Sequence, residues 1–456
     1  MMRGKTQPVQ DRLFSNQDLR RLLIPLMIEQ LLTGLMGMVD TLMVSNVGQT
    51  AVSSVSLVDS INVLMIYLLS ALATGGTIVC AQYLGRRDTQ MANHAARQLL
   101  LSVAAVAALI TASCLVFRKP LLRLVFGGVE AEIMAFAQQY FLLTAISYPF
   151  IGLFNGGAAL CRAEGNAKTP MIVSGCSNLF NIAGNAILIF GFGLGVVGAA
   201  ISTLASRIIS ACWMLALLHR PGRVIRLARL YSTRPDWKMI RTILRIGVPA
   251  GFENGLFQFG KLAVQSTVST LGTTAISVQA VISVVEGTVS MPGTAVGLGL
   301  LTVAGQCMGA GQVEQTRYYT KKFCKWSELA VLISVLVMIA LTQPIGMVAG
   351  MSREALTLMW QINLSIALVK AVLWMPAFTL PNAMRAAGDV KFCAAISTAS
   401  MWAFRVGMSW VLCRYLDFGL FGIWLGWYTD WLVRAVIFVL RYRSGRWSRK
   451  HVLDDL

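Results

Sequence analysis

Long apolar stretches separated by short polar segments run from one end of the chain to the other. Each stretch has about twenty residues or more, the length that an α-helix needs to cross a hydrocarbon core of roughly 30 Å. The pattern predicts twelve membrane-spanning helices, at residues 22–44, 53–83, 98–117, 133–160, 170–190, 196–218, 243–270, 275–305, 327–349, 355–384, 392–414 and 419–440. The second, eighth and tenth exceed one crossing, so we expect them to tilt, kink or extend into the cytoplasm.

The composition excludes a soluble protein. Hydrophobic residues occupy 56% of the 456 positions and charged residues only 13%, and the mean hydropathy is +0.66. A water-soluble chain of this length would need many more charges on its surface. We therefore predict an all-α, multi-pass protein of the inner membrane, with lipid as a partner.

Positive charge follows the loops on one side of the predicted membrane. The net charge of +19 could suggest nucleic acid, but the basic residues concentrate in both tails, in alternate loops and in the segment between spans six and seven. Lysine and arginine are enriched on the cytoplasmic side of membrane proteins. Both termini are therefore predicted to be cytoplasmic, no nucleic acid partner is expected, and the uncleaved first span acts as the anchor.

The two halves of the sequence repeat each other. Pro25 and Glu29 recur as Pro249 and Glu253, at an offset of 224 because 249 − 25 and 253 − 29 are equal. The segments at 81–85 and 305–309 keep that offset, and Arg162 to Lys168 answers Arg385 to Lys391. The predicted organisation is a cytoplasmic tail at 1–21, an N-lobe at 22–218, a basic linker at 219–242, a C-lobe at 243–440 and a basic tail at 441–456.

Each half contains six predicted spans, which fixes the kind of symmetry. With an even number of spans, matching loops lie on the same side of the membrane, so the halves are related by a pseudo-twofold axis along the membrane normal. Two six-helix bundles that face a central cavity follow. This architecture favours alternating access, in which the bundles rock about a site near the middle of the membrane.

Ionisable residues inside the predicted spans are the candidates for function. Each costs about 2.5–3.5 kcal/mol at a helix centre, so it must pair, reach the interface or face a cavity. Pairing or snorkelling is as plausible as function for any one of them, and it is favoured for Arg207 and Arg434, four residues after Thr203 and Asp430. The set is Glu29, Asp40, Asp59, Arg207, Glu253, Lys261, Glu286, Lys370, Arg405, Asp430 and Arg434.

Asp40 and Glu253 are the carboxylates for which function is favoured. Asp40 is far from any cytoplasmic end, and Glu253 follows the helix-kinking Pro249. A carboxylate that faces a cavity can hold a proton or Na⁺ and can also attract an organic cation, so competition for one site would couple the two movements. Asn181 and Asn185, one helical turn apart, could add amide ligands or could simply pack between helices.

Several short motifs in a fixed order resemble the multidrug and toxic compound extrusion (MATE) family over nearly the whole chain. They are Pro25 with Asp40, 81–85 (AQYLG), 162–170, Pro249 with Glu253, 291–293, 305–310 and 385–391. The resemblance implies a secondary antiporter that exports drugs, metabolites or other organic cations in exchange for H⁺ or Na⁺. The substrate is then a small, cationic and amphipathic molecule.

The resemblance also implies roles for particular residues. Asp40 becomes the ion carboxylate of the N-lobe, grouped with Asn181, Asn185 and Thr203 in a site of one formal charge. Some members carry an Asp where this chain has Asn185, so Na⁺ binding is weaker on electrostatic grounds and the coupling ion stays open. The proposed substrate carboxylates are Glu253, Glu29, Glu286 and Asp430.

Other functions are compatible with parts of the pattern. A flippase for a lipid-linked or polyanionic substrate, from the same wider superfamily, would use Lys261, Lys370 and Arg405 to hold pyrophosphate. A major facilitator would have the same span count, but of its loop motif only Gly85 to Arg87 survives. An enzyme or a metal site would need clustered His or Cys residues inside the spans, and the sequence has none. It also has no Walker A motif, so we expect neither ATPase activity nor the need for an ATPase subunit. No cofactor other than the coupling ion is expected.

Overall fold

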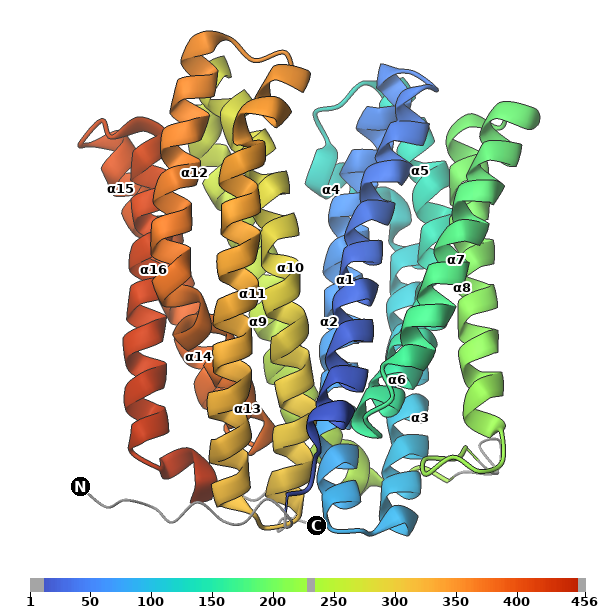
Figure 1. The fold of residues 1–456 in the computed structure, drawn as a ribbon. Helices are drawn as coiled ribbons and strands as arrows, with labels where there is room; N and C mark the ends of the chain where they lie inside the picture. Colours follow the sequence, from blue (N-terminus) through green and yellow to red (C-terminus); the bar gives the residue numbers. More distant parts are fainter. Residues whose placement is uncertain (1–11, 228–233, 450–456) are drawn as a thin grey trace.

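The computed structural model describes residues 12–227 and 234–449, and these fold almost entirely into helices (Figure 1). The predicted tails and linker fall partly on residues 1–11, 228–233 and 450–456, which lie outside the described residues. The first half holds α1 (Asn16–Ser45), α2 (Gln49–Gly85), α3 (Thr89–Val116), α4 (Arg118–Phe126), α5 (Ala131–Ile146), α6 (Tyr148–Ala163), α7 (Lys168–Asn185), η2 (Ala186–Gly191) and α8 (Gly195–His219). The second half holds α9 (Trp237–Ser269), α10 (Thr273–Gly309), α11 (Val313–Val348), α12 (Arg353–Trp374), η4 (Met375–Thr379), α13 (Leu380–Ala386), α14 (Val390–Ser400), η5 (Met401–Met408), α15 (Ser409–Arg414), α16 (Gly419–Arg443) and η6 (Arg446–Arg449).

Every predicted span coincides with a helix or with helices in direct succession. Nine described helical segments are long and apolar enough to cross a membrane, and the bent pair α5–α6 makes a tenth. The other two predicted spans coincide with α9, which carries several charged residues, and with α14–η5–α15, which a π-helical segment interrupts. The prediction of an all-α membrane protein is confirmed.

Several spans are broken where the sequence supplies a reason. α5 and α6 meet at 42° around Ser147, close to Pro149, whose missing N–H weakens a continuous helix. Pro376 lies in the π-helical η4, and η5 holds the buried Arg405. π-helical turns change the direction of the side chains that follow and are frequent at functional sites. Arg405 therefore lies on irregular backbone.

The helices form two bundles, α1–α8 and α9–α16, which stand side by side in Figure 1. The predicted two-lobe architecture is confirmed, and we keep the names N-lobe and C-lobe for these bundles. The end at which α1 begins and α16 finishes is called the base, and the opposite end the far end. At the base α2 and α10 touch: a Cβ atom added at Gly85 would overlap the carbonyl oxygen of Gln306, and one at Gly309 would overlap that of Gln82.

Two hydrogen bonds also cross between the lobes at the base. The Gln82 Nε2 donates to the carbonyl oxygen of Ala386 at 2.7 Å, and the Gln306 Nε2 donates to that of Ala163 at 2.6 Å. Gln82 and Gln306 differ by the repeat offset, so each lobe makes the same bond to the other. We call the two glutamines with Gly85 and Gly309 the base closure.

The same helix faces that meet at the base are exposed in the far half of the molecule. On α2, Ser53, Ser56 and Ser60 lie on the face that continues, at helical spacing, to Gly85, and all three are exposed. Their repeat equivalents on α10, Ser277, Ala280 and Val284, are exposed too. The lobes therefore separate toward the far end, which leaves a cleft between them.

The described part of the linker packs on the N-lobe. His94 of α3 lies 2.9 Å from the Asp236 carboxylate, and the Gln98 Nε2 donates to the carbonyl oxygen of Arg234 at 2.8 Å. The hydrogen bond with His94 holds the pKa of Asp236 below its ordinary value. Asp236 also caps α9 by accepting from the backbone of Met239, so the linker fixes where the C-lobe begins.

A glycine pair on α10 tests the base closure. Gly309→Ala forces α2 and α10 apart, so we expect a loss of about 1–3 kcal/mol, the usual cost of overpacking. Gly287→Ala is the matched control, since nothing lies within 4 Å of its added Cβ. Thermal unfolding in detergent should show a lower midpoint for Gly309→Ala only. Equal midpoints would contradict the close approach.

Candidate functional site

Asp40 on α1 meets the asparagines of α7 inside the N-lobe. The Asn185 Nδ2 donates to the Asp40 Oδ1 at 2.8 Å. With the Asn181 amide turned so that its nitrogen faces Asp40, that nitrogen donates to the same oxygen at 2.8 Å and its own oxygen accepts from the Thr203 backbone N–H at 3.2 Å. The structure thus brings together all four residues that the sequence grouped.

This site contains a negative charge and a free acceptor. The side-chain oxygen of Asn185 is buried and has no hydrogen-bond partner among the described residues. Within the same described part of the chain, no lysine, arginine or histidine nitrogen lies within 4.0 Å of Asp40. A carboxylate and an amide oxygen with no cation beside them are suited to hold a proton or a small cation.

A second polar cluster of the N-lobe surrounds Asp59 on α2. The Asn62 Nδ2 and the Tyr140 hydroxyl donate to its Oδ1 at 3.0 and 3.3 Å, and Tyr148 donates to the Asn62 oxygen at 2.8 Å. The sequence did not group the two tyrosines with Asp59, because α5 and α6 are distant from α2 in the chain. The Arg207 guanidinium donates to the hydroxyl of Ser147, at the bend between α5 and α6, at 2.6 Å. The expected pairing of Arg207 with Thr203, one turn earlier on α8, is therefore replaced by a partner from elsewhere in the lobe.

Two of the predicted substrate carboxylates form matching ion pairs, one in each lobe. Glu29 lies 3.2 Å from the Arg162 guanidinium, and Glu253 lies 2.8 Å from that of Arg385. These residues are repeat equivalents, so both lobes join their first helix to the helix that precedes the fifth span in the same way. Each pair cancels its own charge in a mostly buried position.

The other two predicted substrate carboxylates are paired inside the C-lobe. Glu286 on α10 accepts from the Lys370 ammonium at 2.8 Å and from Ser290 at 2.8 Å. Asp430 on α16 lies 2.8 Å from Arg405 and 2.7 Å from Arg434. The predicted pairing of Arg434 with Asp430 is therefore present, with Arg405 as a second cation.

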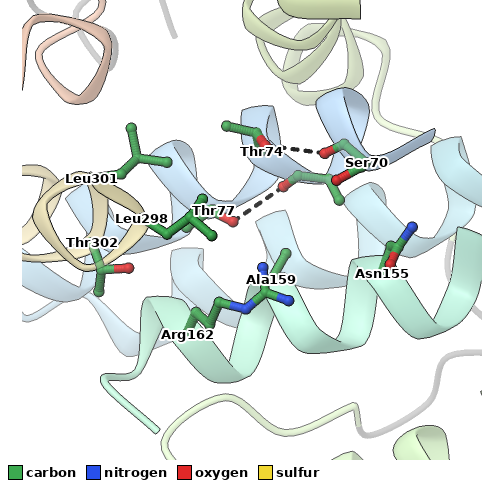
Figure 2. A pocket seen from close by; sticks show the side chains of 10 residues that line it. Ser70, Thr74, Thr77, Asn155, Ala159, Arg162, Leu298, Leu301 and Thr302 are labelled. Carbon is green, nitrogen blue, oxygen red and sulfur yellow. Dashed lines mark hydrogen bonds between the residues drawn. The ribbon is translucent and has the colours of Figure 1, made fainter. Parts of the chain in front are cut away.

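A small cavity lies between the lobes on the base side of the cleft. Figure 2 shows Arg162 beside it, on the helix that also carries Asn155, while Thr74 and Thr77 of α2 bond their own helix at 3.0 and 3.2 Å. The remaining walls come from α2, α6 and α10: Ser70, Ala73, Ala159, Leu298, Leu301 and Thr302. Arg162 thus links the Glu29 ion pair to the space between the lobes.

A family model described as MatE matches this chain twice, over residues 25–187 and 249–411. The two matches are offset by 224 residues, as the internal repeat requires, and together they cover most of the chain. The chain belongs to the MATE family. This is a family of membrane transporters, so no enzymatic activity is implied, and the polar sites lie within the two lobes that the family model describes.

Relatives and solved structures agree with this assignment. The chain is 28% identical over 433 residues to the uncharacterized transporter YisQ of Bacillus subtilis, with 93% of this chain and 94% of the relative covered. It is 26% identical to the probable multidrug resistance protein NorM of Thermotoga maritima, with 96% and 94% covered. An outward-facing MATE transporter structure matches the fold with a TM-score of 0.87 at 21% identity, over 95% of this chain and 96% of that one.

Neutralising Asp430 tests the pairing inside the C-lobe of this MATE transporter. Asp430→Asn leaves two guanidinium groups without their carboxylate, so we expect a loss of about 3–5 kcal/mol of stability. Glu314→Gln is the control, because its pair with Arg317 is solvent-exposed and contributes at most about 1 kcal/mol. Thermal unfolding in detergent compares them. Equal shifts for the two variants would contradict a buried network.

Proposed function

We propose that the chain is a secondary antiporter that exports small amphipathic organic cations, drugs or metabolites in exchange for H⁺ or Na⁺. It acts in the inner membrane with both termini, and hence the base, in the cytoplasm. The printed names of several relatives, probable multidrug resistance proteins, support export of drug-like molecules. The cleft that is closed at the base and separated at the far end supports alternating access.

The observation that carries this proposal is the unpaired charge of Asp40. The Asp40 carboxylate is half-buried beside Asn181 and Asn185, without a cation within 4.0 Å in the described structure, so one positive charge at a time can neutralise the site. A coupling ion and an organic cation then exclude each other, which is the minimum requirement for antiport. Thr203 completes the site through its backbone N–H.

Glu253, Glu29, Glu286 and Asp430 stay proposed as substrate carboxylates, with one condition. Each is already paired with an arginine or lysine, so a cationic substrate must displace that partner or act when the lobes have moved. Asp40 needs no such displacement. We therefore propose that the coupling ion and the substrate compete first for Asp40. The other four carboxylates act later, in substrate recognition, or stabilise the packing of the lobes.

The second candidate is a flippase for a lipid-linked or polyanionic substrate. One observation favours it: Lys261 is exposed and has no carboxylate within 4.0 Å among the described residues. The other two predicted pyrophosphate ligands, Lys370 and Arg405, are 0% and 1% exposed and each pairs with an acid. Within the described structure, only Lys261 of the three therefore has a charge that is free to bind pyrophosphate.

Removing the charge of Asp40 should abolish coupled export. In Asp40→Asn, ethidium efflux from whole cells should fall to the level of cells that lack the protein, because no coupling ion can be held. The matched control is Asp417→Asn, which changes an acid in the loop before α16. Collapsing the Na⁺ and proton gradients separately names the ion. Unchanged efflux by Asp40→Asn would refute the assignment.

The base closure should set the balance between the two states of the transporter. Each cross-lobe hydrogen bond contributes about 0.5–1.5 kcal/mol, so Gln82→Ala with Gln306→Ala should raise the base-open population by roughly tenfold. The readout is the rate at which a thiol reagent labels Thr302→Cys, introduced beside the cavity of Figure 2 in a cysteine-free background. Gln312→Ala, in the nearby α10–α11 turn, is the control. An unchanged labelling rate in the double variant contradicts the proposal.

A further inference from the structure

The C-lobe interior carries an excess of positive charge. We define the C-lobe charge cluster as Lys261, Glu286, Lys370, Arg405, Asp430 and Arg434, which come from α9, α10, α12, η5 and α16. Four of these side chains are cationic and two are anionic, so the cluster has a formal charge of +2. Lys261 is exposed, whereas the other three cations are buried, so the excess charge lies where the cluster reaches the surface of the C-lobe. An uncompensated charge within a membrane span is costly, and it is retained where a ligand or an ion completes the site.

Both carboxylates of the cluster are already ion-paired with cations other than Lys261. Asp430 accepts from Arg405 and Arg434 and also from the Ser400 hydroxyl at 2.7 Å. Glu286 is 2.8 Å from Lys370, whose ammonium also donates to Ser290 at 2.6 Å. Lys261 is left without an acid within 4.0 Å in the described part of the chain.

Lys261 and Arg405 share one aromatic ring. The Lys261 ammonium lies 5.1 Å from the centre of the Phe257 ring, and the Arg405 guanidinium lies 5.0 Å from the same centre. The two cations are therefore no farther apart than the sum of those distances. The Arg405 guanidinium also lies 4.1 Å from the centre of the Trp427 ring. Two cations and two aromatic rings therefore border one region.

The unused hydrogen-bonding groups of this region are donors. The Nε of Arg405 and the indole nitrogen of Trp427 are buried and have no partner among the described residues. Arg405 itself is only 1% exposed, so its Nε is not satisfied by bulk solvent. Donors that lack acceptors, next to a lysine that lacks a counter-charge, require a ligand that brings oxygen acceptors and negative charge.

We propose that the C-lobe binds an anionic group of the transported molecule, a carboxylate, sulfonate or phosphate, between Lys261 and Arg405. The inference rests on the proposed export function and adds to its substrate class: amphipathic molecules that also carry an anionic group, zwitterions included, bind more tightly than simple organic cations. Phe257 and Trp427 bind the apolar part of the molecule. The N-lobe, where Asp40 is unpaired, takes the cationic part.

Two dyes with the same ring system distinguish binding of an anionic group at this site from binding of organic cations in general. Rhodamine 110 has a free carboxylate, and rhodamine 123 is its methyl ester, so only the anionic group differs. Fluorescence anisotropy with the purified full-length protein measures both affinities. We expect rhodamine 110 to bind the wild type about tenfold more tightly than rhodamine 123, the contribution of one charge-assisted contact.

Variants of Lys261 test whether this residue causes the preference for rhodamine 110. Lys261→Met should weaken rhodamine 110 by about tenfold and leave rhodamine 123 unchanged, and Lys261→Arg should restore the preference. Lys325→Met removes an exposed lysine of α11 that lies outside the cluster and should change neither dye. Equal weakening of both dyes by Lys261→Met, or no preference for rhodamine 110 in the wild type, overturns the proposal.

Dye uptake into everted vesicles, which corresponds to export from the cell, distinguishes a failed site from a failed function. If rhodamine 123 moves under an ion gradient while rhodamine 110 shows no Lys261-dependent binding, the antiporter function stands and the anion site is wrong. If rhodamine 110 binds through Lys261 but neither dye moves under any gradient, the site stands and the export function is wrong.

Discussion

The cost of a charge inside hydrocarbon is the constraint on which the rest of this structure depends. Among the described residues, nine side chains satisfy it by ion pairing: Glu29 with Arg162, Glu253 with Arg385, Glu286 with Lys370, and Asp430 with Arg405 and Arg434. Apart from Asp430 with Arg434, which lie one turn apart on α16, these pairs join different helices of one lobe and so help to hold that lobe together. Asp40 and Lys261 have no opposite charge within 4.0 Å in the described part of the chain, and they are then the places where a mobile ion or a substrate has a role.

Because the two lobes are repeats of each other, the contacts that close the base occur in equivalent pairs. Because α2 and α10 are equivalent, a glycine that lets one helix approach the other has a counterpart on its partner, and a glutamine that crosses to the other lobe is answered by a second one. A base closed by two equal halves can open without breaking either lobe. The lobes have nevertheless diverged in charge, with an unpaired carboxylate in one and an unpaired lysine in the other, which allows one molecule to contact both with different groups.

Much of the fold could be predicted from the sequence, since apolar length and the offset of 224 are local or linear features. The same holds for Asp40 with Asn181 and Asn185, where helical spacing and one acid inside a predicted span indicated the group, and for Arg434, one turn from Asp430. The ion pairs of Glu29 and Glu253 could not be predicted, because their partners are about 130 residues away and only the packing of the lobes joins them. Without those partners, the sequence favoured free carboxylates for a cationic substrate.

Ethidium binding to the purified protein, measured over a range of pH and of Na⁺ concentration, tests the central claim most directly. If the coupling ion and the organic cation compete for Asp40, the affinity of the wild type falls as one of the two ions increases, and Asp40→Asn binds with no dependence on that ion. An equal ion dependence in the wild type and in Asp40→Asn would contradict the account.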